Sequence, residues 1–404
     1  MNTKINERQL IVSFIICHLS FSKALCTALC ATLCTAFCAA FCAAFCACEN
    51  DDTDFSAYIN GQEATATDTI NIVYSGSTAS VSGDSRGCVS VNGADVTVND
   101  PTSTQGMVLV LSGSSADGSL LVYRSLKYEV VLNGLTLTNA NGPALNNQCG
   151  KSLYVTLAAG TVNTLSDGTT YAEQGHDQKG TLFSEGQIYF RGTGALKVNG
   201  NCKNGIASDD YIVFQEGTVS VSVAATGSNG VKVNDGLTIE GGTLTIDVLA
   251  DGARGIKDDA YLTISGGQTT ITTAGDCKIE TVDGVTDTTS CAGVKCDSLF
   301  TMTAGTLTIT SSGDGGKGIN SDQNIELKGG TLMVTTTGGN NVGKPKALKS
   351  STAIIVSGGQ LTAQVSKSWA LDNGTESDEP EERVTILGTP TKKTLSKKFV
   401  EIFF

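Results

Sequence analysis

Short bursts of alternating apolar and polar residues run along most of this chain, and glycine separates them. In GLTIEGGTLTIDV, residues 236–248, Leu237 and Ile239 alternate with polar residues, and Leu244 and Ile246 do so again after Gly-Gly. An apolar residue at every second position is the period of a half-buried β-strand, whereas a helix has a period of 3.6. The pattern therefore predicts an all-β chain of short strands joined by glycine turns.

The bursts belong to a repeat with two glycines per unit. The first glycines are Gly205, Gly230, Gly255, Gly293 and Gly318, and the second follow twelve residues later at Gly217, Gly242, Gly267, Gly305 and Gly330. Three of the four steps are 25 residues, and the longer one contains an insertion at 277–291. Units that cannot bury an apolar face alone must stack on their neighbours. We expect a single-stranded right-handed parallel β-helix with coils of about 25 residues.

The predicted β-helix spans residues 69–373. From Thr69 to about Gly168 the strand pattern persists with longer excursions, and downstream Ala347 takes the place of a first glycine, with Gly359 twelve residues later. Residues 374–404 comprise an acidic loop and a Lys-rich tail. Because an open end would expose strand edges, we expect this tail to cap the last coil.

Residues 1–48 have the features of an export signal: basic Lys4 and Arg8, an apolar run and then small residues. Eight of the 14 cysteines lie there, so they are not a disulfide framework. Cys48 follows Ala47 and precedes an acidic linker at 49–68, as in bacterial lipoprotein signals. We expect lipidation at Cys48 and a lipid-anchored protein at the cell surface or outer membrane, with plain secretion or a spanning anchor as alternatives.

The charge of the chain restricts its partners. The formal net charge is −13, and the first 48 residues contribute +2 from Lys4, Arg8 and Lys23 against Glu7, which leaves −15 for the remainder. Such a surface repels nucleic acid and anionic lipid, so contact with a membrane is expected only through the anchor. An anionic polymer would need a divalent cation between it and the protein. We expect a monomer.

Stacked coils turn equivalent repeat positions into columns. One column contains Asp209, Asn234, Asp259, Asp297 and Asp322, and a second contains Lys232, Lys257, Lys295 and, one coil further on, Lys349. A third, four residues before the first glycine, includes Asp251 and Asp314. We expect these columns to share one corner, with carboxylates flanking lysines.

Stacked carboxylates repel one another unless a cation lies between them, and oxygen-rich turns suit Ca²⁺. The predicted calcium ligands are Asp251, Asp259, Asp297, Asp314 and Asp322, with the pairs Asp251–Asp259 and Asp314–Asp322 as the best sites. Two alternatives stay open. The acidic residues could serve only as turn formers, and the lysines could only neutralise them.

Other chemistry has few candidates. His18 and His176 are the two histidines, too few for a histidine-based triad or zinc site. Trp369 is the single tryptophan, which argues against a flat aromatic platform for neutral sugars. Cys277 and Cys291 bracket the insertion, either as a disulfide or as two free thiols.

The segments VNGADVTVN, VVLNGLTLTNANGPAL, VTLAAGTVNTLSDG, LKVNGNCKNGI and the GIK coils with GGTLTI resemble bacterial carbohydrate-binding parallel β-helix proteins, which are related in fold to family 9 pectate lyases. The resemblance covers about Thr69 to Gly374. It implies calcium-dependent binding of acidic, polygalacturonate-like polysaccharide through acidic turns. Gly313-Asp314-Gly315 keeps the turn of that family, whereas Ala250-Asp251-Gly252 lacks the first glycine.

The leading hypothesis is non-catalytic. Calcium bridges protein and uronate carboxylates of a pectin-like polymer, and Lys232, Lys257, Lys295 or Lys349 pairs with further uronates. One alternative is a polysaccharide lyase with Lys257 as the base and Ca²⁺ stabilising the developing charge, although neighbouring carboxylates would raise the pKa of that lysine. Another is a surface adhesin or spacer with no sugar site.

Overall fold

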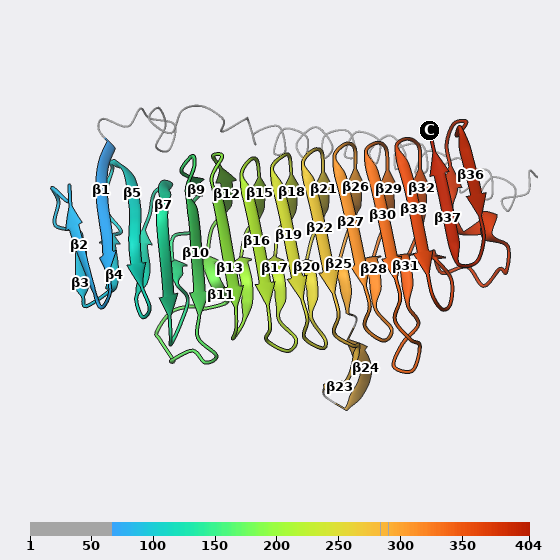
Figure 1. Ribbon diagram of the computed structural model, residues 1–404, viewed down its shortest axis with the longest axis horizontal. Helices are drawn as coiled ribbons and strands as arrows, with labels where there is room; N and C mark the ends of the chain where they lie inside the picture. The colour runs from blue at the N-terminus through green and yellow to red at the C-terminus, as the bar shows by residue number, and fades with distance from the viewer. Residues whose placement is uncertain (1–66, 283, 290) are drawn as a thin grey trace, which may run out of the picture. The chain divides into compact units, whose positions relative to one another are not determined.

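The computed structural model describes residues 67–282, 284–289 and 291–404. The export signal, Cys48 and nearly all of the acidic linker lie outside these residues. Within them the chain forms a parallel β-helix of about 11 coils of roughly 25 residues, which confirms the predicted fold (Figure 1). No helix in the described residues has the length and apolar character needed to cross a bilayer.

Each regular coil has three strands, one on each of three faces. The first face is β4 (Asp95–Asp100), β6 (Ser119–Arg124), β8 (Leu145–Asn147), β11 (Gly180–Ser184), β14 (Asn204–Ser208), β17 (Asn229–Val233), β20 (Arg254–Asp258), β25 (Ala292–Cys296), β28 (Lys317–Ser321), β31 (Lys346–Ser350) and β34 (Leu371–Asp372). Its strands pair in parallel.

The second and third faces belong to one continuous sheet. The second is β9 (Leu153–Leu157), β12 (Ile188–Arg191), β15 (Ile212–Phe214), β18 (Leu237–Ile239), β21 (Leu262–Ile264), β26 (Phe300–Met302), β29 (Ile325–Leu327), β32 (Ile354–Val356) and β35 (Thr385–Ile386). The third is β10 (Val162–Asp167), β13 (Ala195–Gly200), β16 (Thr218–Val223), β19 (Thr243–Val248), β22 (Gln268–Thr273), β27 (Thr306–Ser311), β30 (Thr331–Thr336) and β33 (Gln360–Val365).

The core is a set of stacked apolar ladders. On the third face Val221, Ile246, Ile271, Ile309 and Val334 align from coil to coil, and all are buried. On the second face the rings of Phe190 and Phe214 stack with centroids 4.7 Å apart. Outward positions alternate with these, so polar columns form on the surface of every face.

The ends of the stack depart from the regular coil. The first coils contain β1 (Thr67–Ser75), β5 (Gly106–Ser115) and β7 (Tyr128–Asn139), together with the antiparallel additions β2 (Thr78–Ser82) and β3 (Val89–Asn92). At the other end β37 (Phe399–Phe403) pairs antiparallel with β33 and with β36 (Lys392–Leu395), after the 3-10 turn Pro380–Arg383. These pairings cover strand edges that would otherwise be open.

The insertion at 277–291 forms a hairpin that leaves the coil. Strands β23 (Lys278–Val282) and β24 (Val285–Thr289) pair antiparallel and project from the stack (Figure 1). Strand β20 pairs directly with β25 across it, so the coil register continues as if the hairpin were missing.

Candidate cation and glycan site

The predicted lysine column is present on the first face. Register pairs align Lys232 with Lys257, Lys257 with Lys295, Lys295 with Asn320, and Asn320 with Lys349. The acidic residues two positions later follow these strands at the corner that leads to the second face, which we call corner 1.

At corner 1 the lysines and carboxylates alternate in a ladder of ion pairs. Lys257 Nζ lies 2.6 Å from Asp259 and 2.5 Å from Asp297, and Lys295 Nζ lies 2.8 Å from Asp297 and 2.6 Å from Asp322. Lys232 also pairs with Asp259. Three of the predicted calcium ligands are therefore neutralised by lysines, the alternative that the sequence left open.

The ion-pair ladder shifts the pKa values of its members. Burial alone would raise the pKa of Asp259 and Asp297, but hydrogen bonds from two lysines each hold both pKa values below the usual value. Burial would lower the pKa of Lys257, yet hydrogen bonds to Asp259 and Asp297 raise it. These groups stay charged at neutral pH.

Lys349 differs from the other predicted ligand-binding lysines. The position two residues after it is Ser351 rather than an acidic residue, and the neighbouring Asp372 pairs with Lys346 at 2.8 Å. Among the described residues no carboxylate forms an ion pair with Lys349, so its charge is available to a ligand.

The predicted pairs Asp251–Asp259 and Asp314–Asp322 are not brought together. Strand β20 separates Asp251 from Asp259, and β28 separates Asp314 from Asp322. The members of the first pair also have different partners: Asp251 accepts the N–H of Asp276 before β20, whereas Asp259 pairs with Lys232 and Lys257 after it. The structure thus gives the two members of this pair separate roles, and calcium binding by these residues stays a prediction.

Asp251 and Asp314 instead lie at the corner between the third and first faces, which we call corner 3. Their carboxylates there accept hydrogen bonds from the backbone of neighbouring turns. Asp251 Oδ1 accepts a hydrogen bond from the N–H of Asp276 at 2.8 Å, and Asp276 Oδ1 accepts one from the N–H of Asp314 at 2.6 Å. Asp314 accepts the N–H of Asn341 at 2.9 Å. Each carboxylate thus links one coil to the next, as turn-forming Asp residues do.

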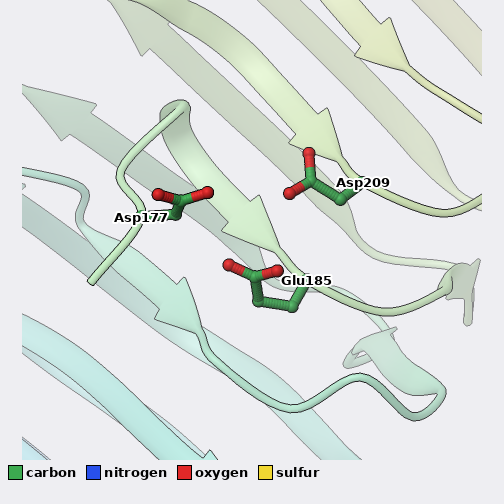
Figure 2. Close-up of side chains that lie close together, drawn as sticks. All are labelled: Asp177, Glu185 and Asp209. Carbon is green, nitrogen blue, oxygen red and sulfur yellow. The ribbon is translucent and has the colours of Figure 1, made fainter.

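Three other carboxylates meet at the N-terminal part of corner 1. Oxygens of Asp177, Glu185 and Asp209 lie within 4.8 Å of one another, one from each residue (Figure 2). Glu185 and Asp209 directly follow β11 and β14, and Asp177 comes from the loop 168–179 that precedes β11. We call these three residues the acidic cluster.

The acidic cluster forms where the lysine column stops. Ser184 aligns with Ser208 and Ser208 with Val233, so Glu185 and Asp209 continue the column of Asp259 toward the N-terminus. The lysine positions in these two coils hold Phe183 and Ala207. Without interleaved lysines, these carboxylates need a cation from elsewhere.

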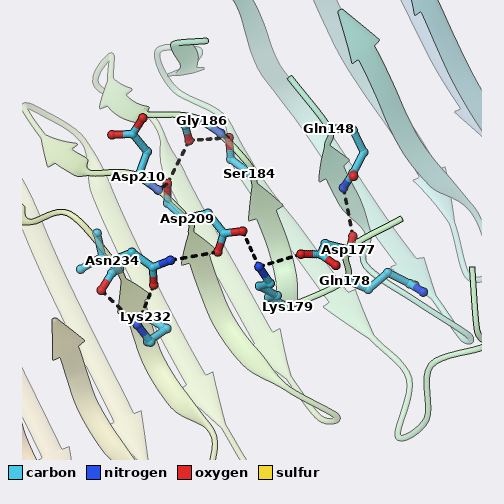
Figure 3. Close-up of polar contacts among 12 residues, drawn as sticks. Gln148, Asp177, Gln178, Lys179, Ser184, Gly186, Asp209, Asp210, Lys232 and Asn234 are labelled. Atoms are coloured by element: carbon cyan, nitrogen blue, oxygen red, sulfur yellow. Dashed lines mark hydrogen bonds and ion pairs between the residues drawn. The ribbon is translucent and has the colours of Figure 1, made fainter. Parts of the chain in front are cut away.

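In the structure that cation is the ammonium of Lys179. Its Nζ lies 2.7 Å from Asp177 and also bonds Asp209, between the two (Figure 3). The hydrogen bond and charge of Lys179 lower the pKa of Asp177. Burial, and then the nearby Asp209 carboxylate, raise the pKa of Glu185. Glu185 is thus the member that most lacks a compensating positive charge.

An open hollow of about 410 Å³ adjoins the cluster on the first face. Its lining includes Lys179, Lys203, Lys232, Asp209, Asn229 and Asn234. Asn234 Nδ2 donates to Asp209 at 3.3 Å, and Lys232 donates to Asn234 at 2.8 Å (Figure 3). Positive and amide groups thus surround the acidic cluster, a setting suited to an anionic or hydroxyl-rich ligand.

Comparison with known proteins identifies the family of this chain. The family profile of the carbohydrate-binding domain-containing proteins matches residues 92–278 and 249–341, more than half of the chain. The chain belongs to this family. The matched region contains the acidic cluster, the adjoining hollow and most of the ion-pair ladder, so this carbohydrate-binding domain includes the candidate site.

Two relatives extend the comparison. A carbohydrate-binding domain-containing protein of Acetivibrio thermocellus is 30% identical over 125 residues, which are 30% of this chain and 44% of that protein, less than half its length. A solved structure, described as the polysaccharide lyase-like protein from C. thermocellum in a gadolinium derivative, is 23% identical with a TM-score of 0.55 and covers 66% of this chain and 100% of that one. The second likeness concerns the fold.

The sequence contained part of the signal for the acidic cluster. Asp209 was placed in the acidic column, and its coil carries Ala207 where later coils carry lysine. That missing lysine marks a carboxylate that the lysine column itself does not neutralise. Asp177 could not be found this way, because its loop lies outside the 25-residue repeat.

Proposed function

We propose that this carbohydrate-binding protein binds acidic, uronate-containing polysaccharide of the pectin type, and that the acidic cluster holds Ca²⁺. One observation supports this proposal: the carboxylates of Asp177, Glu185 and Asp209 meet next to a hollow that three lysines line. It also explains how a chain of net charge −13 could bind a polyanion.

The donor set suits calcium. Ca²⁺ accepts six to eight oxygens at about 2.3–2.6 Å in flexible geometry. Three carboxylates leave coordination positions open for sugar oxygens and water. The ion would take the place of the Lys179 ammonium, whose side chain is 41% exposed and so can turn toward the hollow and pair with a uronate carboxylate.

The lysines predicted to bind sugar divide into two groups under this proposal. Lys232 borders the hollow, and Lys349, further along the same column, forms no ion pair with any carboxylate that the structure describes. Lys257 and Lys295 are each held by two carboxylates. We expect Lys232 and Lys349 to contribute more to polymer binding than Lys257 and Lys295.

Calcium binding is tested with Asp209→Asn and the matched variant Asp297→Asn, which removes a carboxylate from the same column within the lysine ladder. We expect Asp209→Asn to weaken calcium affinity by about tenfold or more, since one of few charged ligands is lost. Asp297→Asn should leave calcium affinity unchanged. Isothermal titration with calcium alone gives the affinities, and retention on immobilised polygalacturonate with and without calcium reports on the polymer. Equal calcium affinities of the two variants would contradict the proposed site.

Lys179 provides a second test because calcium and its ammonium compete for the same oxygens. Lys179→Met should increase calcium affinity, since the ion no longer displaces a bound charge. At saturating calcium the same variant should bind polygalacturonate more weakly, because one uronate partner is lost. A variant with unchanged affinity for both ligands would remove Lys179 from the site.

The lyase alternative requires a lysine that can accept a proton. Lys257 is paired with two carboxylates that raise its pKa, which disfavours the neutral amine. The polygalacturonate incubation distinguishes the two functions, because a lyase produces unsaturated products that absorb ultraviolet light. Binding without new absorbance supports the non-catalytic function, and a protein that neither binds nor cleaves would fit an adhesin or spacer.

The proposed setting is the cell surface. Lipidation at Cys48 would anchor the protein there, and further acyl groups would make the attachment stable. The anchored protein would be a monomer. The polymer site would then face extracellular polysaccharide.

A further inference from the structure

A second hollow lies on the same first face, over the coils that precede the acidic cluster. It has a volume of about 450 Å³. Its floor comes from outward residues of β4 and β6, including Thr97, Ser119 and Leu121, and one wall is the turn 139–143. The other wall is the loop 168–179, through Gln174, His176 and Gln178.

Several hydrogen bonds hold this loop in place. The N–H of Ala172 donates to Asn141 O at 2.8 Å, and Asn146 Nδ2 donates to Asp177 O at 3.1 Å. The Tyr123 hydroxyl and His176 Nδ1 lie 2.9 Å apart. The hollow is therefore formed before a ligand arrives, as small-molecule sites usually are.

The charge of this hollow is opposite to that of the hollow beside the acidic cluster. Its lining contains the carboxylates of Asp95 and Asp117 and the amides of several Asn and Gln residues, but no Lys or Arg among the described residues. Burial lowers the pKa of His176, so that ring is neutral at pH 7.

Both carboxylates keep an oxygen for a ligand. Asp95 Oδ1 accepts from Ser119 Oγ at 2.7 Å, and Asp117 Oδ1 accepts from the N–H of Ala140 at 3.2 Å. Within the described part of the chain, the second oxygen of each has no protein donor. Leu121 and Pro143 add apolar surface to the lining, which suits the C–H face of a sugar ring.

We propose that this hollow binds an amino-sugar unit of a glycan, with its ammonium facing Asp95 and Asp117 and its hydroxyls bonding the surrounding amides. Ammonium donors and carboxylate acceptors form charge-assisted hydrogen bonds, whereas a uronate would meet two like charges. The two sites lie on opposite sides of the loop 168–179, since Gln178 lines this hollow and Asp177 joins the acidic cluster. The protein would then select sugars of opposite charge at two places on one face.

Three oligosaccharides of equal length test this proposal: oligomers of glucosamine, of N-acetylglucosamine and of galacturonate. Isothermal titration is performed in chelator at a pH where the amine keeps its proton. We expect the glucosamine oligomer to bind about tenfold or more tightly than its N-acetylated counterpart, as charge-assisted hydrogen bonds imply. The galacturonate oligomer should not bind.

The variant Asp95→Asn/Asp117→Asn should abolish the preference for the amine. Its matched control, Glu376→Gln/Asp378→Asn, removes the same charge from the exposed loop near the C-terminus and should keep the preference. The proposal would be overturned if both variants lost the preference for the amine equally. It would also be overturned if the unchanged protein bound the glucosamine and N-acetylglucosamine oligomers equally well. Asp209→Asn should not affect this binding, so failure here is distinct from failure of the calcium site.

Discussion

Each first glycine of the repeat lies opposite a branched side chain across the core. A Cβ added at Gly205, Gly230, Gly255, Gly293 or Gly318 would lie 2.0–2.4 Å from a γ-carbon of the residue sixteen positions later, closer than atoms can pack. The last full coil has Ala347 instead, and its residue sixteen positions later is the small Ala363. A backbone carbonyl oxygen of the next coil also lies 2.4–3.0 Å from each added Cβ and is most distant at Gly293. The opposing side chain and this carbonyl thus both favour glycine, and alanine occurs where the opposing side chain is small.

This compensation can be transferred to an earlier coil. Gly293→Ala should destabilise the protein by about 1–3 kcal/mol, because its Cβ would overlap Ile309 Cγ2. Ile309→Ala alone should cost about 2–5 kcal/mol through the cavity it leaves. The double variant should lose less than the sum of the two by about 1 kcal/mol or more, measured by denaturant unfolding. Strict additivity would contradict the packing explanation.

Asp258 is a carboxyl group inside the β-helix. Its side chain is 0% exposed, Oδ1 accepts the N–H of Ala260 at 2.7 Å, and Oδ2 has no hydrogen-bond partner among the residues that the structure describes. Burial raises the pKa of Asp258 from 3.8 to about 7. In the folded protein this group therefore keeps its proton over a range in which the unfolded chain has lost it.

The contribution of Asp258 to stability should consequently fall as pH rises. Between about pH 4 and 7 the folded state holds one more proton at Asp258 than the unfolded state, so raising the pH favours unfolding by on the order of 4 kcal/mol in total. Asp258→Asn keeps the shape without ionising, so it should be more stable than the parent at pH 8 and similar at pH 4. Thermal unfolding at both pH values measures this. A parent and variant with the same pH dependence would show that Asp258 titrates normally.

At the scale of the element, the hairpin β23–β24 interrupts one coil, and two thiols lie at its base. The N–H of Cys291 lies 3.4 Å from Cys277 Sγ, and both side chains are buried. Hydrogen bonding by Cys291, and then the charge of Lys317, lower the pKa of Cys277 despite burial, while the pKa of the Cys291 thiol, which also donates to Asp276 O at 2.7 Å, rises. A thiolate beside a thiol is the reactant pair for disulfide exchange.

We expect oxidised glutathione to convert this pair into a disulfide. The Cys277 thiolate attacks glutathione disulfide, and Cys291 then displaces the bound glutathione, giving two reduced glutathione molecules per bridge. Peptide mapping of the folded protein should show Cys277 linked to Cys291, a loss of two hydrogens. Cys277→Ser should retain a free Cys291. A hairpin whose two thiols stay free in the folded, oxidised protein would refute this.

At the scale of the whole β-helix, register turns local alternation into long columns of charge. The ladder from Lys232 to Asp322 lets carboxylates stack along corner 1 without mutual repulsion, because each lysine bridges two coils. Such exposed pairs add little stability individually, and a network adds more than isolated pairs. Under the proposed function, the ladder leaves the coils beyond its N-terminal end as the place for a calcium ion.

The sequence by itself determined the coil length, the strand faces and the membership of the columns. Each of these follows from a periodic pattern that repeats every 25 residues, so counting from Gly205 or Gly230 was sufficient. It did not reveal which columns share a corner. It paired Asp251 with Asp259 as metal ligands, although the two residues lie on either side of strand β20.

Only the tertiary structure decided where the candidate sites lie. The loop 168–179 is outside the repeat, and its placement depends on long-range contacts such as Tyr123 with His176 and Asn146 with Asp177. Those contacts bring Asp177 and Lys179 to the end of the acidic column and close one wall of the second hollow. Local periodicity carries no information about such a loop, because its energy comes from groups that meet only after the coils have stacked.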